Sequence, residues 1–577
     1  MNVVRYCLGL LLWLAAVCQA QSVLIIATSP VPQGKLTLLR EIGRQQGLQV
    51  QAELVEKLSP QAVPGPFAGR DLVIFEAGRE HMQAVVRGRL APALPGLKAP
   101  HIWMRDDAPQ AQGLPPALAQ RLHAYFVNGG RANFENFFRT LNAHFAGRSA
   151  DGIAPPFVFP EMAVYYPKSP QQIFARPADY LRWRGIDPAQ RPPTVAIAFH
   201  QQYLGAEMMT QIDDLIRRIE AGGGLALPYY AGVMGPHAAM LTVNGQRVAD
   251  VVINTQIVLD PEGRRKELAA LGIPVLQSLA YRKGDVADWR ADPLGLALMD
   301  VPFYLAQAEY TGIIDPMVTH ASNKLDGSIA VIDEQSQALV NKALNLVRLQ
   351  RLPNADKRLA VLFWNYPPGE KNLSASYLNL PRSFVSTLQA LQAAGYQTRP
   401  QDEDWLVSRL QRLLAPFYRD GQLAGLLRDD LAERLPVKTY RAWLKQLPPA
   451  VQAELQQRWG DPEKSAMVLR DGGEPVFVIP RLAIGQVIFS PQAPRGEKWE
   501  DKEKALYHST TAAPSHFYLA QYLWLRAGYQ SDAIIHYGTH GSQEWLPGKE
   551  RGLSVNDYPL LAVGDVPVIY PYIVDNI

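Results

Sequence analysis

The alternation of apolar and polar positions predicts one local plan that occurs three times along the chain. In each case a short, continuously apolar run is followed by a turn and then by a segment with apolar residues at helical spacing that ends at glycine. The predicted strands lie at 23–30, 194–200 and 359–368, and the predicted helices at 34–47, 206–224 and 383–396. In the third helix Phe384, Leu388 and Leu391 share one face. We therefore expect an α/β protein built of several stacked, flavodoxin-like units.

Proline-rich stretches indicate where these units separate. Prolines cluster between 155 and 170 and again at 191–193, which predicts a domain boundary near residue 150, and a second boundary is predicted near Pro353. Between 400 and 463 the pattern becomes helical and polar before apolar strands resume. The predicted domains are therefore 21–150, 151–353 and 354–577, the last with a helical insertion at 400–463.

The first twenty residues have the pattern of a secretory signal. Arg5 precedes an apolar run from Tyr6 to Val17, and a small residue, Ala20, precedes the expected cleavage point. No later stretch approaches the roughly 20 apolar residues of a membrane-spanning helix. The mature chain is thus expected to be exported to the periplasm. Lipid attachment at Cys18 is an alternative, although Val17 is bulkier than such signals favour.

Composition narrows the possible chemistry. Both cysteines, Cys7 and Cys18, lie in the predicted signal, so the mature chain has no thiolate for a disulfide or a metal. A metal would need histidine, carboxylate or a ligand's own nitrogens. The chain has 57 basic and 54 acidic residues, which gives a net charge of +3. Removal of the predicted signal takes away Arg5 and leaves 56 basic against 54 acidic residues, a net charge of +2. This balance does not favour nucleic acid as a partner.

Histidines gather near the C-terminus in a span of 33 residues that contains four of the eleven: His508, His516, His536 and His540. A strand is predicted over 532–537, and Gly538 and Gly541 then disfavour a helix. His540 and Glu544 are therefore expected on a loop at the carboxyl end of a strand, where open α/β sheets bind ligands.

Imidazole can ligate a metal or accept a proton, and a carboxylate can do either, so His536, His540 and Glu544 are candidate metal ligands and catalytic groups. The alternative is that His536 packs in the core and His540 bonds to backbone. Neither an HExxH helix nor a phosphate loop is present, since Gly548-Lys549 is followed by Glu550. We expect no nucleotide site in this chain.

Three long segments resemble one family. The runs YHSTTAAPSHFYLAQYLWLR, AIIHYGTHGSQEWLPGKERGLS and GDVPVIYPYIVDN are similar to the CobN and magnesium-chelatase H family, the large subunits of metal-tetrapyrrole chelatases. Shorter matches are PQAPRG, LPPAVQAELQQRWGDPE, LAVLFWNYPP and AEYTGIIDP. The resemblance covers roughly residues 150–577.

The resemblance implies a tetrapyrrole as substrate or ligand and a divalent cobalt, magnesium or iron ion, with Glu544, His540 and His536 in the metal-insertion site. It places Glu309 at the position of a family glutamate, although the residues around it depart from the pattern; an exposed turn carboxylate is the alternative. Arg495 and Gln492 could meet a propionate, and a surface salt bridge is the alternative. The remaining candidates are His508 and His516, on either side of a predicted helix start, and Trp524 and Trp545, which could stack on the ring or lie in the core.

Two hypotheses follow. In the first the chain is a chelatase or dechelatase, with ATP-driven motor subunits as family partners; ATP coupling conflicts with export. In the second it is an exported tetrapyrrole or metal-ion carrier that serves a TonB-type uptake system. The family's chains continue well beyond the point that matches Ile577, so the sequence is expected to be a fragment, a frameshifted product or a split subunit.

Overall fold

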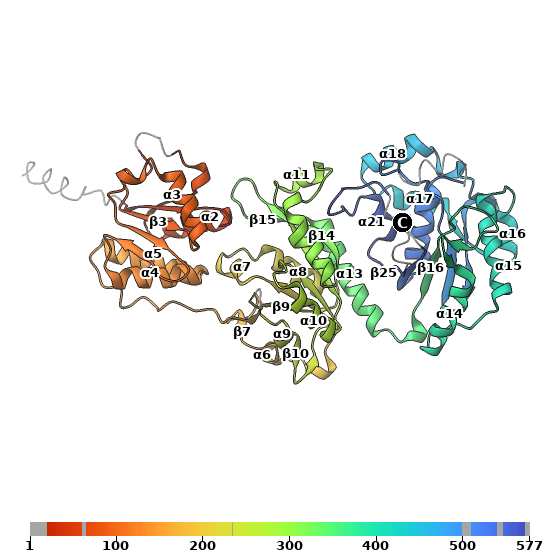
Figure 1. The fold of residues 1–577 in the computed structure, drawn as a ribbon, viewed down its shortest axis with the longest axis horizontal. Coiled ribbons are helices and arrows are strands. Elements are labelled where there is room, and N and C mark those ends of the chain that lie inside the picture. The colour runs from red at the N-terminus through yellow and green to blue at the C-terminus, as the bar shows by residue number, and fades with distance from the viewer. Residues whose placement is uncertain (1–19, 60–64, 233–234, 499–508, 539–545, 572–577) are drawn as a thin grey trace, which may run out of the picture. The chain divides into compact units, whose positions relative to one another are not determined.

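The computed structural model describes residues 20–59, 65–232, 235–498, 509–538 and 546–571 (Figure 1). The chain divides into two compact units. The first comprises Met1–Met162, His200–Gln211 and Ser322–Ala330, and the second comprises Ala163–Phe199, Ile212–Ala321 and Val331–Ile577. The domain boundaries near residues 150 and 353 stay predictions.

The first unit is built around a five-stranded sheet whose first four strands are parallel. In spatial order the strands are β2 (Gln49–Leu54), β1 (Ser22–Ala27), β3 (Leu72–Glu76), β4 (His101–Met104) and the antiparallel β5 (Gln110–Gln112). Its main helices are α2 (Gln33–Gln45), α3 (Glu80–Leu90), α4 (Pro116–Asn128) and α5 (Arg131–Phe145). This strand order is that of flavodoxin-like folds, so the prediction of α/β architecture is confirmed here.

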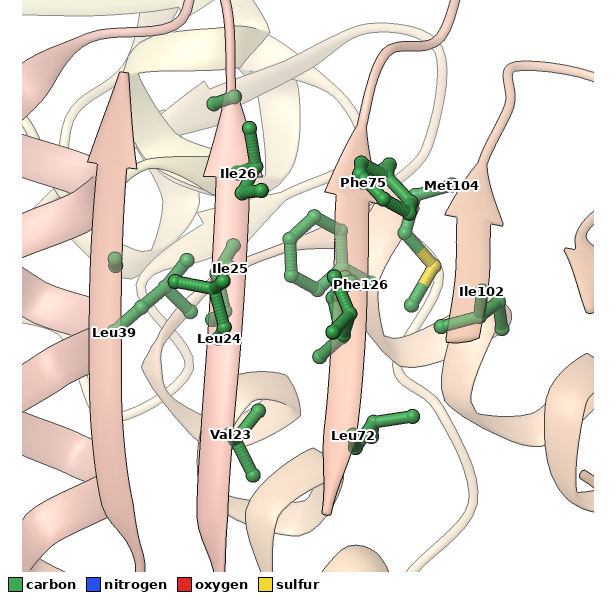
Figure 2. Close-up of a cluster of buried hydrophobic side chains, with 14 of the residues drawn as sticks. Val23, Leu24, Ile25, Ile26, Leu39, Leu72, Phe75, Ile102, Met104 and Phe126 are labelled. Carbon is green, nitrogen blue, oxygen red and sulfur yellow. The ribbon is translucent and has the colours of Figure 1, made fainter. Parts of the chain in front are cut away.

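The core of this unit explains why its strands are continuously apolar. Figure 2 shows Leu24 and Ile25 on β1 between Leu39 of α2 and Phe126 of α4, all of them buried. A parallel strand covered by helices buries both faces, so its side chains do not alternate between apolar and polar.

The second unit contains an eight-stranded sheet whose central strands are parallel. The order is β15 (Ile329–Val331), β14 (Ile313–Ser322), β13 (Val275–Tyr281), β12 (Val251–Asn254), β8 (Thr194–Phe199), β9 (Leu225–Tyr230), β6 (Ala163–Tyr165) and β7 (Ile173–Phe174). Helix α8 (Thr210–Ala221) lies within the predicted helix 206–224, and the short helix α7 (Gln201–Gly205), which belongs to the first unit, precedes it. Helix α13 (Asp333–Arg351) then leads to the C-terminal sheet.

The C-terminal sheet, drawn in green to blue in Figure 1, has the order β22 (Leu482–Ile484), β23 (Val487–Pro491), β16 (Leu359–Phe363), β24 (Ala533–Tyr537) and β25 (Val568–Ile569). Only β22 is antiparallel. The helices of this part are α14 (Leu380–Ala393), α15 (Glu403–Leu414), α16 (Leu423–Arg428), α17 (Val437–Leu444), α18 (Pro449–Trp459), α20 (His516–Leu523) and α21 (Tyr558–Val563).

The region predicted as a helical insertion also contains a strand. Four of the helices above, α15 to α18, fall within 400–463, but β19 (Ala432–Pro436) pairs with β21 (Glu474–Pro480), which also pairs with β20 (Val468–Asp471). The partner of β19 lies about forty residues away in sequence, so local periodicity does not reveal it. Among the described residues, no helix combines the length and apolar character that crossing a bilayer requires.

Candidate functional site

The order of the strands in the C-terminal sheet identifies a ligand crevice. The connection after β16 runs to β23 on one side, whereas the connection after β24 runs to β25 on the other. Open α/β sheets bind ligands at the carboxyl ends of two such adjacent strands. The segment that follows β24 begins at Gly538 and continues into the predicted His540 and Glu544. The histidine-rich motif therefore leaves the sheet at its switch point.

Gly538 allows β16 and β24 to approach closely at this edge. A Cβ atom at position 538 would lie 2.7 Å from Cβ of Trp364, which directly follows β16. The Trp364 backbone N–H donates to the Tyr537 carbonyl at 3.1 Å. The first glycine of the motif is therefore required by packing between two neighbouring strands.

His536 is the motif histidine that the structure describes, and it is buried within β24, with 3% of its surface exposed. Its Nε2 lies 3.0 Å from the Tyr522 hydroxyl oxygen. Tyr522, on α20, donates its own proton to Oε1 of Gln492 at 2.9 Å. When Tyr522 donates to Gln492, its oxygen accepts from His536, and the tautomer of His536 that fits this arrangement carries hydrogen on Nε2 and the lone pair on Nδ1.

Burial lowers the pKa of His536 to about 4 and raises that of Tyr522 well above its ordinary value. Both effects have desolvation as their largest cause, because burial penalises the charged form of each group. At neutral pH the pair is uncharged. An uncharged imidazole with a defined tautomer can accept a proton or donate its lone pair to a metal.

Gln492 follows β23, and its surroundings hold it in place. Its backbone N–H donates to the Phe363 carbonyl at 2.8 Å. Gln521 of α20 donates to both the Ser490 hydroxyl and the Pro491 carbonyl at 2.8 Å and accepts from Ala493 N–H at 3.2 Å. Among the described residues, the Gln492 side-chain Nε2 is buried without a hydrogen-bond partner.

Arg495 and His516 occupy structural positions near this edge. Arg495 is 2% exposed and donates from Nη1 to the Ser509 carbonyl at 2.8 Å. His516 begins α20 and uses both ring nitrogens, Nδ1 with the Tyr440 hydroxyl at 2.9 Å and Nε2 with the Gly460 carbonyl at 3.0 Å. Roles for Arg495 and His516 in tetrapyrrole binding stay predictions, and ligation by His516 would require one of these bonds to break.

Of the other predicted residues, the structure describes Glu309 and Trp524. Glu309 is exposed on the short helix α12 (Gln307–Tyr310), far along the chain from the C-terminal sheet. Trp524 is buried and stacks on Tyr529 with ring centroids 5.8 Å apart, so it takes the core role rather than a ring-binding one. His508, His540, Glu544 and Trp545 lie outside the described residues.

The sequence analysis did not predict two residues that hold this edge through hydrogen bonds, Tyr522 and Gln521. The helix HFYLAQYL is buried on every side, so a polar residue within it must find an internal partner. That rule could have marked Gln521 and Tyr522 as members of a buried network. Within the part of the chain that the structure describes, no group of three or more histidine, cysteine or carboxylate side chains is arranged to hold a metal ion.

The segment that follows the motif is anchored to the region of the eight-stranded sheet. Lys549 Nζ donates to the Arg290 carbonyl at 3.2 Å, and Arg551 N–H donates to the Leu294 carbonyl at 3.0 Å. Gln335 of α13 donates to the Leu553 carbonyl at 3.1 Å and accepts from Val555 N–H at 2.7 Å. The motif thus begins on one sheet and is held at its far end by residues around another.

Comparison with known proteins shows which family the chain belongs to. Residues 123–577 match the family model described as CobN/Magnesium Chelatase, which is well over half of the chain. The chain belongs to the CobN/magnesium chelatase family.

The chain is similar in sequence to both cobaltochelatase and magnesium-chelatase subunits. The chain is 28% identical to the aerobic cobaltochelatase subunit CobN of Sinorhizobium sp, with 89% of this chain and 40% of that protein covered. It is 26% identical to the H-type magnesium-chelatase subunit of Rhodobacter capsulatus, with 85% and 42% covered. The chain therefore spans less than half the length of these relatives.

A solved structure shares the fold. The catalytic subunit of cobaltochelatase from Mycobacterium tuberculosis superposes with a TM-score of 0.73 at 24% identity, over 96% of this chain and 46% of that one. The match confirms the α/β architecture of the family across nearly the whole chain.

Proposed function

We propose that the chain binds a tetrapyrrole and takes part in the insertion or removal of its metal ion, with the crevice beyond β16 and β24 as the site. The observation that carries the proposal is the position of His536, an uncharged imidazole of fixed tautomer, directly before the motif loop at the switch point of the sheet. The names of the family's relatives, cobaltochelatase and magnesium-chelatase, supply the substrate class.

Proton transfer determines which groups the reaction needs. A metal ion that enters a tetrapyrrole replaces the inner N–H protons, two in a porphyrin and one in a corrin, and the same number returns when the metal leaves. The metal is a substrate in either direction. We assign Glu544 as the base that moves these protons and His540 as a transient metal ligand, with His536 and its Tyr522–Gln492 partners holding the strand from which the loop departs.

A second candidate function is an exported carrier that binds the ring or its metal without turnover. The signal-like segment at residues 1–20 favours it, since a protein outside the cytoplasm meets no ATP and so no motor subunit. An uptake receptor would then be the expected partner. Periplasmic location and the identity of the partner are parts of this proposal.

The test is a spectroscopic titration of the purified chain with haem, a cobalt corrinoid and free-base porphyrin, one ring at a time. The variant carries His540→Ala and Glu544→Ala, and the matched control carries His144→Ala and Glu80→Ala, both at exposed positions. We expect saturable binding by the parent and control and at least about tenfold weaker binding by the variant, as expected when hydrogen bonds to charged groups are lost.

The spectra distinguish the two candidates. Slow conversion between the metallated and free-base spectra in the parent, absent in the variant, indicates a chelatase. Binding without conversion, with or without added metal, favours the carrier. The proposal is overturned if no ring binds or if the variant binds every ring as tightly as the parent.

A further inference from the structure

A cavity of about 320 Å³ lies between α13 and α21, and Val555, which directly follows the motif run, forms part of its wall. Arg526 and Asp565 line it, and each precedes a strand of the C-terminal sheet, β24 and β25 respectively. The cavity is therefore at the amino end of these strands, whereas the motif leaves from the carboxyl end. A five-residue strand spans about 16 Å, so the two locations are distinct.

Arg526 and Asp565 are the two charged residues of this cavity that form no ion pair with a described residue. Among the described residues Arg526 forms no hydrogen bond or ion pair, and its Nε is buried without a partner. Desolvation lowers the pKa of its guanidinium, and the charge of Asp565 only partly opposes this effect. Arg526 is half-buried, so its guanidinium loses part of its hydration without gaining a direct partner, which favours an added anion.

Gly564 makes room for this guanidinium. A Cβ atom at position 564 would lie 2.3 Å from Nη1 of Arg526 and 3.2 Å from Cζ. Gly564 also adopts a φ of 58°, where glycine is favoured over residues with a side chain. The backbone is thus shaped around the arginine, which keeps the guanidinium against the cavity wall.

The other charged residues of the wall are already engaged. Glu334 accepts from Arg290 at 3.0 Å, and Lys342 lies 3.2 Å from Asp315. Asp565 forms no ion pair with a described residue, although its carbonyl accepts from Asn345 Nδ2 at 2.9 Å. Asp565 is therefore the carboxylate that would compete with a bound anion for Arg526.

The other side chains that line the cavity are apolar, aromatic or amide side chains. Leu560, Leu561 and Met317 contribute apolar surface, Trp443 an indole ring, and Asn341 a further polar side chain. Inorganic anions make little use of apolar surface, whereas an organic acid would bury its carbon skeleton against it. The planar fork of arginine suits a carboxylate, which can accept two parallel hydrogen bonds.

We propose that this cavity is a second ligand site, which binds a small organic carboxylate through Arg526 with the carbon skeleton against Leu560 and Trp443. The site is independent of the tetrapyrrole crevice and of the function proposed for it.

Calorimetric titration of the full chain with sodium benzoate at constant ionic strength tests this site, with inorganic phosphate as the second probe. We expect saturable binding of benzoate, weaker binding of phosphate, and at least about tenfold weaker benzoate binding by Arg526→Gln. The matched control, Arg458→Gln, removes an exposed arginine that lies over Trp459 and should bind like the parent. Asp565→Asn removes the competing carboxylate and should tighten binding several-fold.

Thermal unfolding without added anion separates a ligand site from a structural arginine. Because Arg526 is half-buried and forms no ion pair with a described residue, Arg526→Met should unfold at the same temperature as the parent or above it. The proposal is overturned by an absence of benzoate binding, by unchanged binding in Arg526→Gln, by weaker binding in Asp565→Asn, or by a midpoint several degrees lower in Arg526→Met. Phosphate binding as tight as benzoate binding would overturn the assignment to organic acids.

Discussion

His536 is surrounded by groups that favour an uncharged imidazole. Its hydrogen-bond partner is the neutral Tyr522, and Tyr522 in turn bonds to the neutral Gln492. Burial is the cause of the lowered pKa, and no charge offsets it. A histidine in such a position keeps its neutral form, and with it one basic nitrogen, across the physiological range.

This burial predicts a pH dependence of stability. The pKa of His536 is about 4 in the folded protein against 6.5 ordinarily, so between these values the unfolded chain binds more protons. Stability should therefore fall as pH falls from about 6.5 to about 4, by up to about 3 kcal/mol for a shift of this size. In His536→Gln that part of the loss should be absent.

Denaturant unfolding at several pH values across this window measures the effect. Other buried histidines are shared by the parent and the variant, so their contributions cancel in the difference. The exposed His144→Gln is the control and should follow the parent. Identical pH profiles for His536→Gln and the parent would contradict the prediction.

At the scale of elements, the crevice depends on how closely β24 approaches β16. The two strands are in parallel register from Leu359 to Phe363, opposite Ala533 to Tyr537. Beyond their ends the backbone of Gly538 lies against Trp364, a buried side chain. Helix α20 fixes the neighbouring end of β23 through Gln521. Packing on both sides thus defines where the motif loop begins.

Gly538→Ala should destabilise the second unit. The new methyl group would lie 2.7 Å from Cβ of Trp364, so the strand ends must separate, at a cost of about 1–3 kcal/mol for overpacking. Gly425→Ala is the control, because its nearest contact is the end of the Arg428 side chain at 3.7 Å. Denaturant midpoints should fall for Gly538→Ala and hold or rise for Gly425→Ala. If Gly538→Ala and the parent had equal denaturant midpoints, the ends of β16 and β24 would accommodate the methyl group without loss of stability, and the prediction would be wrong.

At the scale of the second unit, the motif is held at one end by β24 and at the other by residues around the eight-stranded sheet. Gln335 on α13 makes two hydrogen bonds to the backbone at Leu553 and Val555. Backbone held by such bonds opens rarely, and proteases cleave mainly the open form.

Gln335→Leu should therefore accelerate limited cleavage by trypsin after Lys549 and Arg551. The substitution removes both bonds to the segment and leaves its carbonyl and N–H without their partner. Cleavage several-fold faster than in the parent is expected. The control, Gln350→Leu, lies on the same helix and bonds instead to the Asp250 carbonyl, so cleavage at these two sites should not change. Equal rates in all three proteins would show that Gln335 does not restrain the segment.

The sequence by itself determined the apolar strands and much of the helical packing. Strands predicted at 23–30, 194–200 and 359–368 appear as β1, β8 and β16, and Phe384 and Leu388 are fully buried on α14. The predicted strand before the motif is β24. These features are readable because burial on both faces of a parallel sheet, or on one face of a helix, imposes a local pattern.

Only the tertiary structure decided which side chains meet. His536, Tyr522 and Gln492 lie on three separate segments, and their contact follows from the spatial order β23-β16-β24 and from the packing of α20. The pairing of β19 with β21 and the cavity around Arg526 arise in the same way. Strand order and long-range packing depend on the whole chain, so no local spacing of residues determines them.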